Sequence, residues 1–499
     1  MSQSPKLTRW ENIFAPIPNE WLVIYRLAFG AVMAYYAIYS LISGRVDLFY
    51  VIPLHHFPYD GFAWISKLDF WMSPSVHAMH VEYSAMAILA ILILLGAFYR
   101  VSATLFALVF CHVFLIDKCY YQNHYYLISL LSLIMPFLPA HRSCSVDVIL
   151  RRVRRSRTTP RWTLWLIRFM IGIPYLYGGI AKLSPDWVRG QPMRLAMADK
   201  VDIPLFGEFV TQEWFVQTLV WGGLLFDLMV VPALLYRRTR VLAFLLCLVF
   251  HLTNSQVWTI GVFPWLMMAA TTVFFEPDWP RRVVQRFGQR FDDTCSKAQE
   301  ALPTPIVRWT TLGILFVFVS WQVMFPLRHF ILPDNPNWDE YTHHFSWHML
   351  LRGKKCGLRV VATDPSTGRS GTVDLRMYVT ARQLAVVVRD PRMIHQLTHY
   401  IARNLRDRGY PRLEIRVLSL VSLNGRQPQL MIDPHVDLIS RRLGGYPDFV
   451  VPLRQPLRYS AWDYPLAEWE QRLELELPSQ MQFPTREVSQ SSVVNDEPN

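Results

Sequence analysis

Long apolar runs separated by polar segments fill the first two thirds of this chain. Runs of about 17–25 residues, the length that crosses the hydrocarbon core of a bilayer, recur between residues 20 and 330. Nine such runs lie at residues 20–43, 80–99, 101–117, 124–140, 161–182, 214–236, 239–254, 256–276 and 308–328. The third, fourth and seventh are short, and residues 251–258 could instead form a re-entrant turn. The pattern predicts a polytopic α-helical membrane protein with about nine transmembrane helices.

The pattern changes to that of a smaller α+β extramembrane domain after residue 345. Two hairpins are predicted, one around the turn at residues 364–368 and one around Asn424-Gly425, a dipeptide that favours tight turns. Helical spacing covers residues 393–408, and a short helix is predicted over 465–477.

The predicted organisation therefore has four parts. They are a cytoplasmic N-terminus at residues 1–19, a transmembrane domain at 20–330, an outer α+β domain at 345–483 and a disordered tail at 484–499.

The formal net charge of +12 comes largely from three basic clusters in loops. These clusters lie at residues 142–161, 237–240 and 281–297. With nine spans and the N-terminus inside, all three fall on the cytoplasmic side, as the positive-inside rule requires. The charge therefore indicates membrane topology rather than nucleic-acid binding, and it places residues 345–480 outside.

The six cysteines follow no disulfide framework. Cys119 and Cys356 alone share the outer side, so a bridge between them is possible. No Cys-x-x-Cys spacing appears, and no metal site is predicted.

Polar side chains gather at the outer ends of several predicted spans. The group comprises Asn123, His124, Lys182, His251, Asn254, Ser255, Gln256, Trp347 and Arg352, with Asp227 inside the sixth span. Ionisable residues at membrane depth are costly and usually mark a pathway or a site.

Each of these residues also has a structural explanation. Lys182 can extend to the interface as an anchor, or it can be a base, since lost hydration favours the neutral amine. His124 can cap a helix start, while His251 and Asn254 can satisfy backbone groups freed by a broken helix. Asp227 is predicted to hold helices together by hydrogen bonding rather than to act in catalysis.

Several ordered motifs carry a resemblance to a known family. They are Phe114-Leu-Ile-Asp-Lys-Cys-Tyr-Tyr-Gln-Asn-His124, Gly179-Ile-Ala-Lys-Leu-Ser-Pro-Asp-Trp-Val-Arg-Gly190, Gly222-Gly-Leu-Leu-Phe-Asp-Leu228, Phe250-His-Leu-Thr-Asn-Ser-Gln-Val-Trp-Thr-Ile-Gly261, Phe345-Ser-Trp-His-Met349 and Asp433-Pro-His-Val-Asp437. Over residues 15–480 the chain resembles the vitamin K-dependent γ-glutamyl carboxylase family, whose membrane region, the HTTM domain, is shared with bacterial proteins.

The resemblance implies two coupled reactions. A reduced naphthoquinone, vitamin K hydroquinone or menaquinol, is deprotonated and oxygenated by O2 to an epoxide. The strongly basic intermediate removes a proton from the γ-carbon of a protein glutamate, and the carbanion takes up CO2. The protein would then be a lyase of the peptidyl-glutamate 4-carboxylase type with vitamin K epoxidase activity.

The resemblance also implies roles for individual residues. Lys182 matches the family's catalytic base, and His124 its active-site histidine. The quinone would be held by Asn123, His251, Asn254 and Gln256. The glutamate substrate would be held by Ser255, Trp347 and Met349. No metal takes part.

The expected partners follow from the same resemblance. They are membrane lipid, a glutamate-containing protein or peptide and a quinone-reducing system, without nucleic acid. The expected location is the bacterial inner membrane, with the active site facing the periplasm.

Departures from the family pattern leave two other functions open. Ala181 replaces the first of two adjacent lysines, and the chain ends soon after Leu477, without the long extension of the animal enzymes. A quinol epoxidase without carboxylation is one alternative. A non-catalytic membrane protein that binds or transports a quinone is the other.

Overall fold

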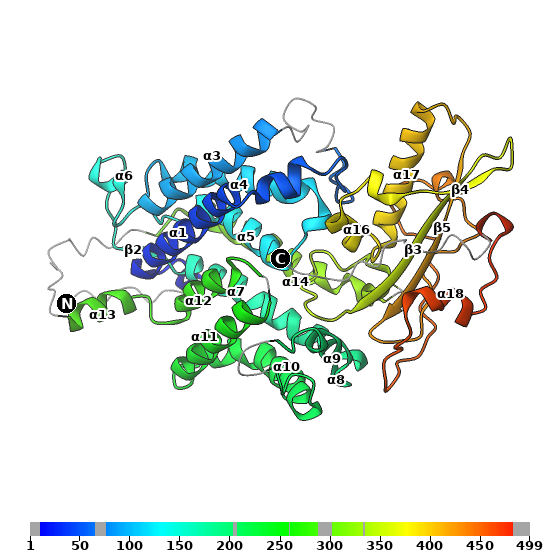
Figure 1. Ribbon diagram of the computed structural model, residues 1–499. Coiled ribbons are helices and arrows are strands. Elements are labelled where there is room, and N and C mark those ends of the chain that lie inside the picture. The colour runs from blue at the N-terminus through cyan, green and yellow to red at the C-terminus, as the bar shows by residue number, and fades with distance from the viewer. Residues whose placement is uncertain are drawn as a thin grey trace, which may run out of the picture.

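The computed structural model describes residues 10–64, 76–202, 207–258, 260–287, 302–332 and 335–482. Helices dominate this part of the chain up to Phe330, and a four-stranded sheet follows in a smaller C-terminal region. Figure 1 shows the sheet-containing region at one end of the helical part. The predicted fold class is thereby confirmed. The tail predicted to be disordered lies outside the described residues.

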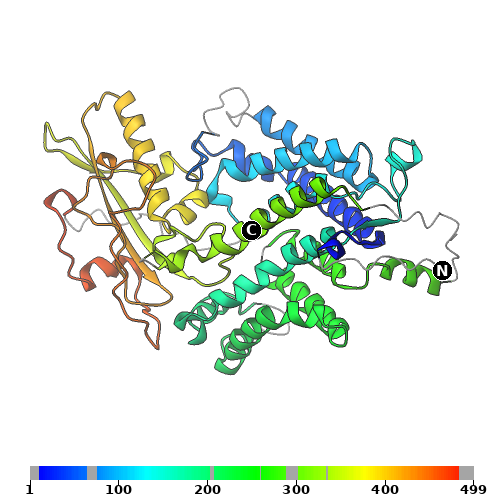
Figure 2. The ribbon, with the colours of Figure 1, turned by 180° about the vertical axis from the view of Figure 1, so that it is seen from behind.

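Among the described residues, seven helices are long and apolar enough to cross a membrane. They are α1 (Glu20–Ile42), α3 (Val76–Leu95), α4 (Tyr99–Ile116), α7 (Arg161–Ala181), α10 (Glu213–Leu235), α11 (Arg240–Val257) and α14 (Pro305–Met324). Seen from behind, α14 crosses the helical part (Figure 2). Its Phe316, Val317 and Trp321 side chains are exposed. Apolar side chains that face outward along whole helices are expected where lipid is the solvent. The protein is an integral membrane protein.

Two of the nine predicted spans form shorter helices. The fourth becomes α5 (Asn123–Ile134), continued by η5 (Met135–Phe137), and the eighth becomes α12 (Phe263–Thr271), continued by η6 (Thr272–Phe274). At about 1.5 Å per residue, neither crosses a bilayer core alone. Because α11 continues to Val257, the predicted alternative of a re-entrant turn over residues 251–258 is wrong.

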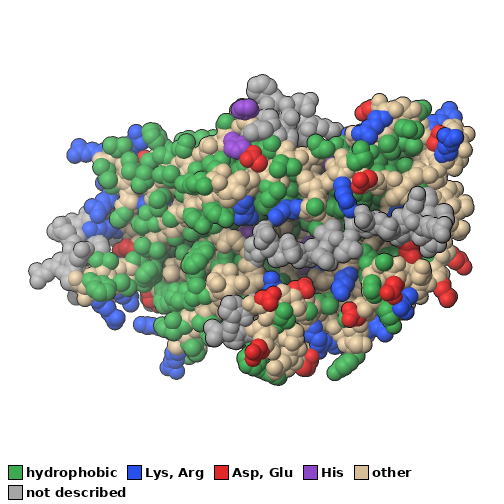
Figure 3. Space-filling view, viewed as in Figure 1, with side chains coloured by type: hydrophobic (Ala, Val, Ile, Leu, Met, Phe, Trp, Pro, Cys, Tyr) green, Lys and Arg blue, Asp and Glu red, His purple; other side chains and the backbone are tan. Residues whose placement is uncertain are grey.

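The described basic segments meet at the end of the helical part that lies away from the sheet. There β1 (Pro16–Pro18) pairs with β2 (Thr158–Pro160), and α13 (Trp279–Arg286) lies nearby (Figure 1). Arg240 pairs with Glu276 at 3.1 Å, and Arg281 pairs with Glu20 at 3.4 Å. Figure 3 shows Lys and Arg side chains at this end and hydrophobic side chains along the helices. This distribution agrees with the topology predicted from the loops.

The C-terminal region is built on an antiparallel sheet with the strand order β4-β3-β5-β6. The strands are β3 (Lys354–Thr363), β4 (Ser370–Thr372), β5 (Glu414–Leu423) and β6 (Gln429–Leu430). Both predicted hairpins are present. The predicted helix is α17 (Pro391–Asp407), and α16 (Ala381–Val387) precedes it. The Asp390 carboxylate caps α17 by accepting hydrogen bonds from the Arg392 and Met393 N–H groups.

Both faces of the sheet are covered because β5 alternates its apolar side chains between two cores. Val417 and Val421 pack in the core that contains Leu397 of α17, whereas Leu420 packs in the core that contains Trp469 of α18 (Trp469–Arg472). Shorter elements connect the rest: η1 (Glu11–Phe14), η2 (Asp47–Val51), η4 (Lys118–Tyr120), α6 (Val146–Ile149), α8 (Pro185–Val188), α9 (Gln191–Ala198), η7 (Phe325–Phe330), α15 (Pro336–Asp339), η8 (Leu375–Met377), η9 (Leu438–Ser440), η10 (Leu466–Glu468) and η11 (Ser479–Met481).

The possible disulfide between Cys119 and Cys356 is not formed. Both cysteines are thiols in the structure, and Cys119 is buried. Cys119 lies in the apolar core of the C-terminal region, against which Cys356 packs, so both act as small apolar side chains there.

Candidate active site

Lys182 lies directly after the last turn of α7, with its amine inside the protein. Its backbone N–H bonds to the carbonyls of Gly178 and Gly179, and its side chain is only 7% exposed. The Nζ atom pairs with Asp227 Oδ2 on α10 and lies 5.1 Å from the centre of the Trp187 ring. An interface anchor would place this amine in water, whereas here it is enclosed by a carboxylate and an aromatic ring.

Two glycines on α7 allow this arrangement. A Cβ atom at Gly178 would lie 2.8 Å from Met349 Cε and 3.0 Å from Asp227 Oδ2. A Cβ atom at Gly179 would lie 2.6 Å from Leu228 Cδ2. Small residues at helix contacts let helix backbones approach closely. The two glycines therefore bring α10 and the loop that carries Met349 against the helix of Lys182.

His251 and His124 extend the site along the inner surfaces of the helices. His251 Nε2 lies 2.7 Å from the Tyr175 hydroxyl oxygen. Tyr175 lies on the same face of α7 as Lys182, two turns earlier. The Phe263 ring of α12 lies between the two histidines, 6.0 Å from the His251 ring and stacked 5.2 Å from the His124 ring. Four helices, α5, α7, α11 and α12, thus meet around these rings.

The segment Phe345–Met349 joins the C-terminal region to this group. The Asn123 amide donates a hydrogen bond to the His348 carbonyl at 2.8 Å, and the Tyr121 hydroxyl donates to Asn123 Oδ1 at 2.9 Å. Trp347 is buried against Tyr126, with ring centres 4.8 Å apart. Phe345 and Trp347 have φ values of 63° and 60°. Such left-handed backbone at non-glycine residues is strained and clusters at functional sites.

The side chains of the other three predicted site residues are not part of the group around Lys182 and the two histidines. Asn254, Ser255 and Gln256 lie on the last turn of α11. The Ser255 hydroxyl donates to the Leu252 carbonyl at 2.7 Å, and the Gln256 amide donates to Ser255 Oγ at 3.2 Å. Within the described residues, no hydrogen bond links these three side chains to Lys182 or His251.

The turn after Lys182 ties the helical part to the C-terminal region. Asp186 accepts two hydrogen bonds from the Arg426 guanidinium, at 2.6 and 2.7 Å, and one from the Asn424 amide at 2.7 Å. Asn424 and Gly425 both have positive φ, as the predicted tight hairpin turn requires. The same short motif thus supplies a candidate base, its aromatic neighbour Trp187 and the anchor of the β5–β6 turn.

Sequence reasoning missed two of the partners. Asp227 contacts Lys182, although it was expected only to hold helices together. Tyr175 was not singled out, yet it contacts His251. Tyr175, Gly178, Gly179 and Lys182 are spaced i, i+3, i+4 and i+7, which places them on one face of α7. This spacing could have identified Tyr175 from the sequence as a residue on the same helix face as Lys182.

Buried charges and histidines line the start of the C-terminal region beside the site. Lys354 Nζ donates to Glu340 Oε1 at 2.7 Å and to the Trp338 and Arg389 carbonyls, and Arg352 also pairs with Glu340. Burial lowers the pKa of His344 to about 4 and the pKa of His348 to about 3, so both imidazoles are neutral at pH 7. Among the described residues, no group of His, Cys, Asp or Glu side chains has the arrangement of a metal site.

Comparison with known families identifies the class of protein and then the family. The HTTM domain family matches residues 14–279, which cover the helices up to the start of α13. The family described as vitamin K-dependent gamma-carboxylase, lumenal domain, matches residues 308–455. The chain belongs to the vitamin K-dependent gamma-carboxylase family and is a carboxylase-like membrane protein. No solved structure matches it.

Proposed function

We propose that this protein couples O2-dependent epoxidation of a reduced naphthoquinone to carboxylation of protein glutamate with CO2. The observation that carries the proposal is Lys182, whose amine is buried against Asp227 where the membrane helices meet the C-terminal region. A base in this position is shielded from water yet lies at the level where an apolar quinol can enter from lipid. Membership of the gamma-carboxylase family supports the same reaction class.

The pair of Lys182 and Asp227 can supply the free amine that a base requires. If the proton on Nζ moves to Oδ2, a neutral amine and a neutral acid result, and the net charge of the site is unchanged. Lys182 can then take a proton from a bound hydroxyl, which leaves an ammonium at Nζ beside the protonated Asp227 and an oxyanion on the ligand.

The residues around this pair fit a reduced naphthoquinone. His251 Nδ1, Trp347 Nε1 and His348 Nδ1 are buried and have no hydrogen-bond partner in the part of the chain that the structure describes, as the polar ends of such a ligand would require. The stacked rings of His124 and Phe263 provide an aromatic wall. When bound, the quinol supplies reducing power and, with O2, the strong base that the glutamate carbon requires. His124, with Asn123, Asn254 and Gln256, is proposed to orient it.

The glutamate side chain is proposed to approach from the outer, periplasmic side. Trp347 and Met349 lie on the segment that joins the C-terminal region to the site, and Ser255 is proposed to contribute from α11. We place the protein in a bacterial inner membrane, with lipid, a glutamate-containing protein and a quinone-reducing system as partners. The apolar helices support the membrane location, and the position of the basic loops supports the orientation.

Epoxide formation tests the proposal. Purified protein in lipid would receive menaquinol or vitamin K hydroquinone with O2, and mass spectrometry would measure the quinone epoxide. We expect Lys182→Ala to lower the rate by at least about 100-fold, the contribution of a positioned base. Lys200→Ala is the matched control, because Lys200 also lies over a tryptophan ring, Trp258, on the outer side. Full epoxidation by Lys182→Ala would rule out the assigned base.

A further inference from the structure

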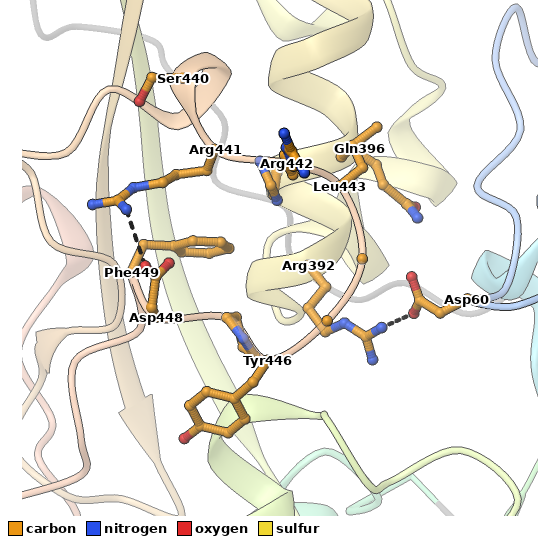
Figure 4. Close-up of a pocket in the computed structure, with 14 residues that line it drawn as sticks. Asp60, Arg392, Gln396, Ser440, Arg441, Arg442, Leu443, Tyr446, Asp448 and Phe449 are labelled. Carbon is orange, nitrogen blue, oxygen red and sulfur yellow. Dashed lines mark hydrogen bonds and ion pairs between the residues drawn. The ribbon is translucent and has the colours of Figure 1, made fainter.

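A cavity lies in the C-terminal region, away from Lys182. It has a volume of about 500 Å³, within the usual range for ligand pockets. The first turns of α17, including Arg392 and Gln396, form one wall, and the loop from Ser440 to Phe449 forms another. Asp60, from the outer loop between α1 and α3, lies at the edge of the cavity (Figure 4).

Arginines dominate the charge of this cavity. Arg392 extends from α17 toward Asp60 and pairs with it, and Arg441 pairs with Asp448 at 3.0 Å (Figure 4). Arg442 lies on the loop above Arg392 and is exposed, and no carboxylate pairs with it within the described residues. Three guanidinium groups therefore face two carboxylates, which leaves one positive charge in excess.

We infer that this cavity binds an acidic segment of a polypeptide, with Arg442 holding a carboxylate of that segment. Two guanidinium groups of this cavity already pair with the carboxylates of Asp60 and Asp448. Arg442 can pair in the same way with a carboxylate of the ligand. Gln396 Oε1 is buried without a partner and suits a peptide N–H group. The exposed side chains of Leu443 and Tyr446 offer apolar contacts beside the charges.

The inference rests on the proposed function for the identity of the polypeptide, which is the protein whose glutamate is carboxylated.

Tyr341 connects the cavity to the candidate active site. Its ring lies 4.9 Å from the Arg392 guanidinium carbon and 5.5 Å from the Tyr446 ring. Six residues later along the chain, Trp347 packs into the candidate active site. An acidic segment held in the cavity therefore lies next to the segment that reaches Met349.

Peptide binding tests the inference independently of catalysis. Full-length protein in lipid nanodiscs would be titrated into a fluorescently labelled peptide rich in Asp and Glu, and anisotropy would give the Kd. We expect Arg442→Gln to raise the Kd about tenfold, the effect of losing one charge-assisted contact. Arg412→Gln, which removes an exposed arginine of the same region outside the cavity, should leave the Kd unchanged.

The remaining outcomes separate this inference from the proposed function. Epoxide formation without peptide should be normal in Arg442→Gln, and its loss would indicate a structural role for Arg442 and overturn the inference. An unchanged Kd in Arg442→Gln would also overturn it, while leaving the epoxidation result untouched. Equal binding of a peptide with Gln and Asn in place of Glu and Asp, or displacement by equimolar inorganic phosphate, would contradict recognition of an acidic peptide.

Discussion

At the scale of single residues, the pair of Lys182 and Asp227 determines the chemistry of the site. Charges at this depth are stable only when they are paired, because removal from water costs each of them several kcal/mol. Both side chains are almost fully buried, and Gly178 leaves the space that Asp227 Oδ2 occupies. Replacing either residue would leave the other buried without its partner.

Asp227→Asn tests this interdependence. The amide keeps the shape of the side chain but cannot take the lysine proton, so we expect epoxide formation to fall by about 100-fold. The pH profile of the remaining rate should change as well, because an amide, unlike the carboxylic group, cannot exchange a proton with the Lys182 amine. Asp227→Glu should recover part of the rate. A normal rate and an unchanged pH profile in Asp227→Asn would mean that the carboxylate only holds the helices together.

Part of the site could be predicted from the sequence because its residues end helices at one level of the membrane. His124 and His251, which both contact the Phe263 ring, are an example. The pairing of Lys182 with Asp227 could not be predicted, since it depends on how α7 and α10 are rotated and how closely they approach. That geometry is set by Gly178 and Gly179, whose role appears only in three dimensions.

At the scale of elements, hydropathy predicted where helices occur better than where they end. The apolar run after α5 continues beyond Ile134, but Pro136 lies in the tighter η5 turn, and the helix stops there. Gly261, with a φ of 56°, and Pro264 at the helix start confine α12 to a shorter segment than the apolar run 256–276. A window average cannot detect such local backbone signals.

The β5–β6 turn is the element that holds the C-terminal region against the Lys182 motif. Arg426→Ala would remove the double hydrogen bond to Asp186, which is largely buried, and leave that carboxylate without its guanidinium partner. We expect the protein to lose about 3 kcal/mol of stability and to unfold at a lower temperature. Thermal unfolding in detergent measures the change, with Arg412→Ala as the control. An unchanged Tm would show that this contact does not stabilise the protein.

At the scale of the whole molecule, charge and hydropathy together indicate orientation. The described basic segments gather at one end of the helical part, and the sheet lies at the other (Figures 1 and 3). Cytoplasmic loops carry an excess of Lys and Arg, so the basic end is expected inside the cell. This arrangement was predictable from the sequence because it depends on loop composition rather than on packing.

Cys144 provides a natural probe of that orientation, since it is exposed at the basic end. In a variant that keeps only this cysteine, a membrane-impermeant thiol reagent should label inverted vesicles and spare right-side-out vesicles. Ser366→Cys, on the exposed turn between β3 and β4, should give the opposite result in a cysteine-free background. Labelling of both positions from the same side would contradict the topology.

The most direct test of the central claim measures both products in one reaction. Protein in lipid would receive reduced quinone, O2, labelled CO2 and a glutamate-containing peptide, and quinone epoxide and peptide-bound label would be counted together. We predict both products from the wild type, and neither from Lys182→Ala although Lys200→Ala keeps both. Epoxide without peptide label would indicate a quinol epoxidase. The absence of both products from a folded wild-type protein would contradict the account.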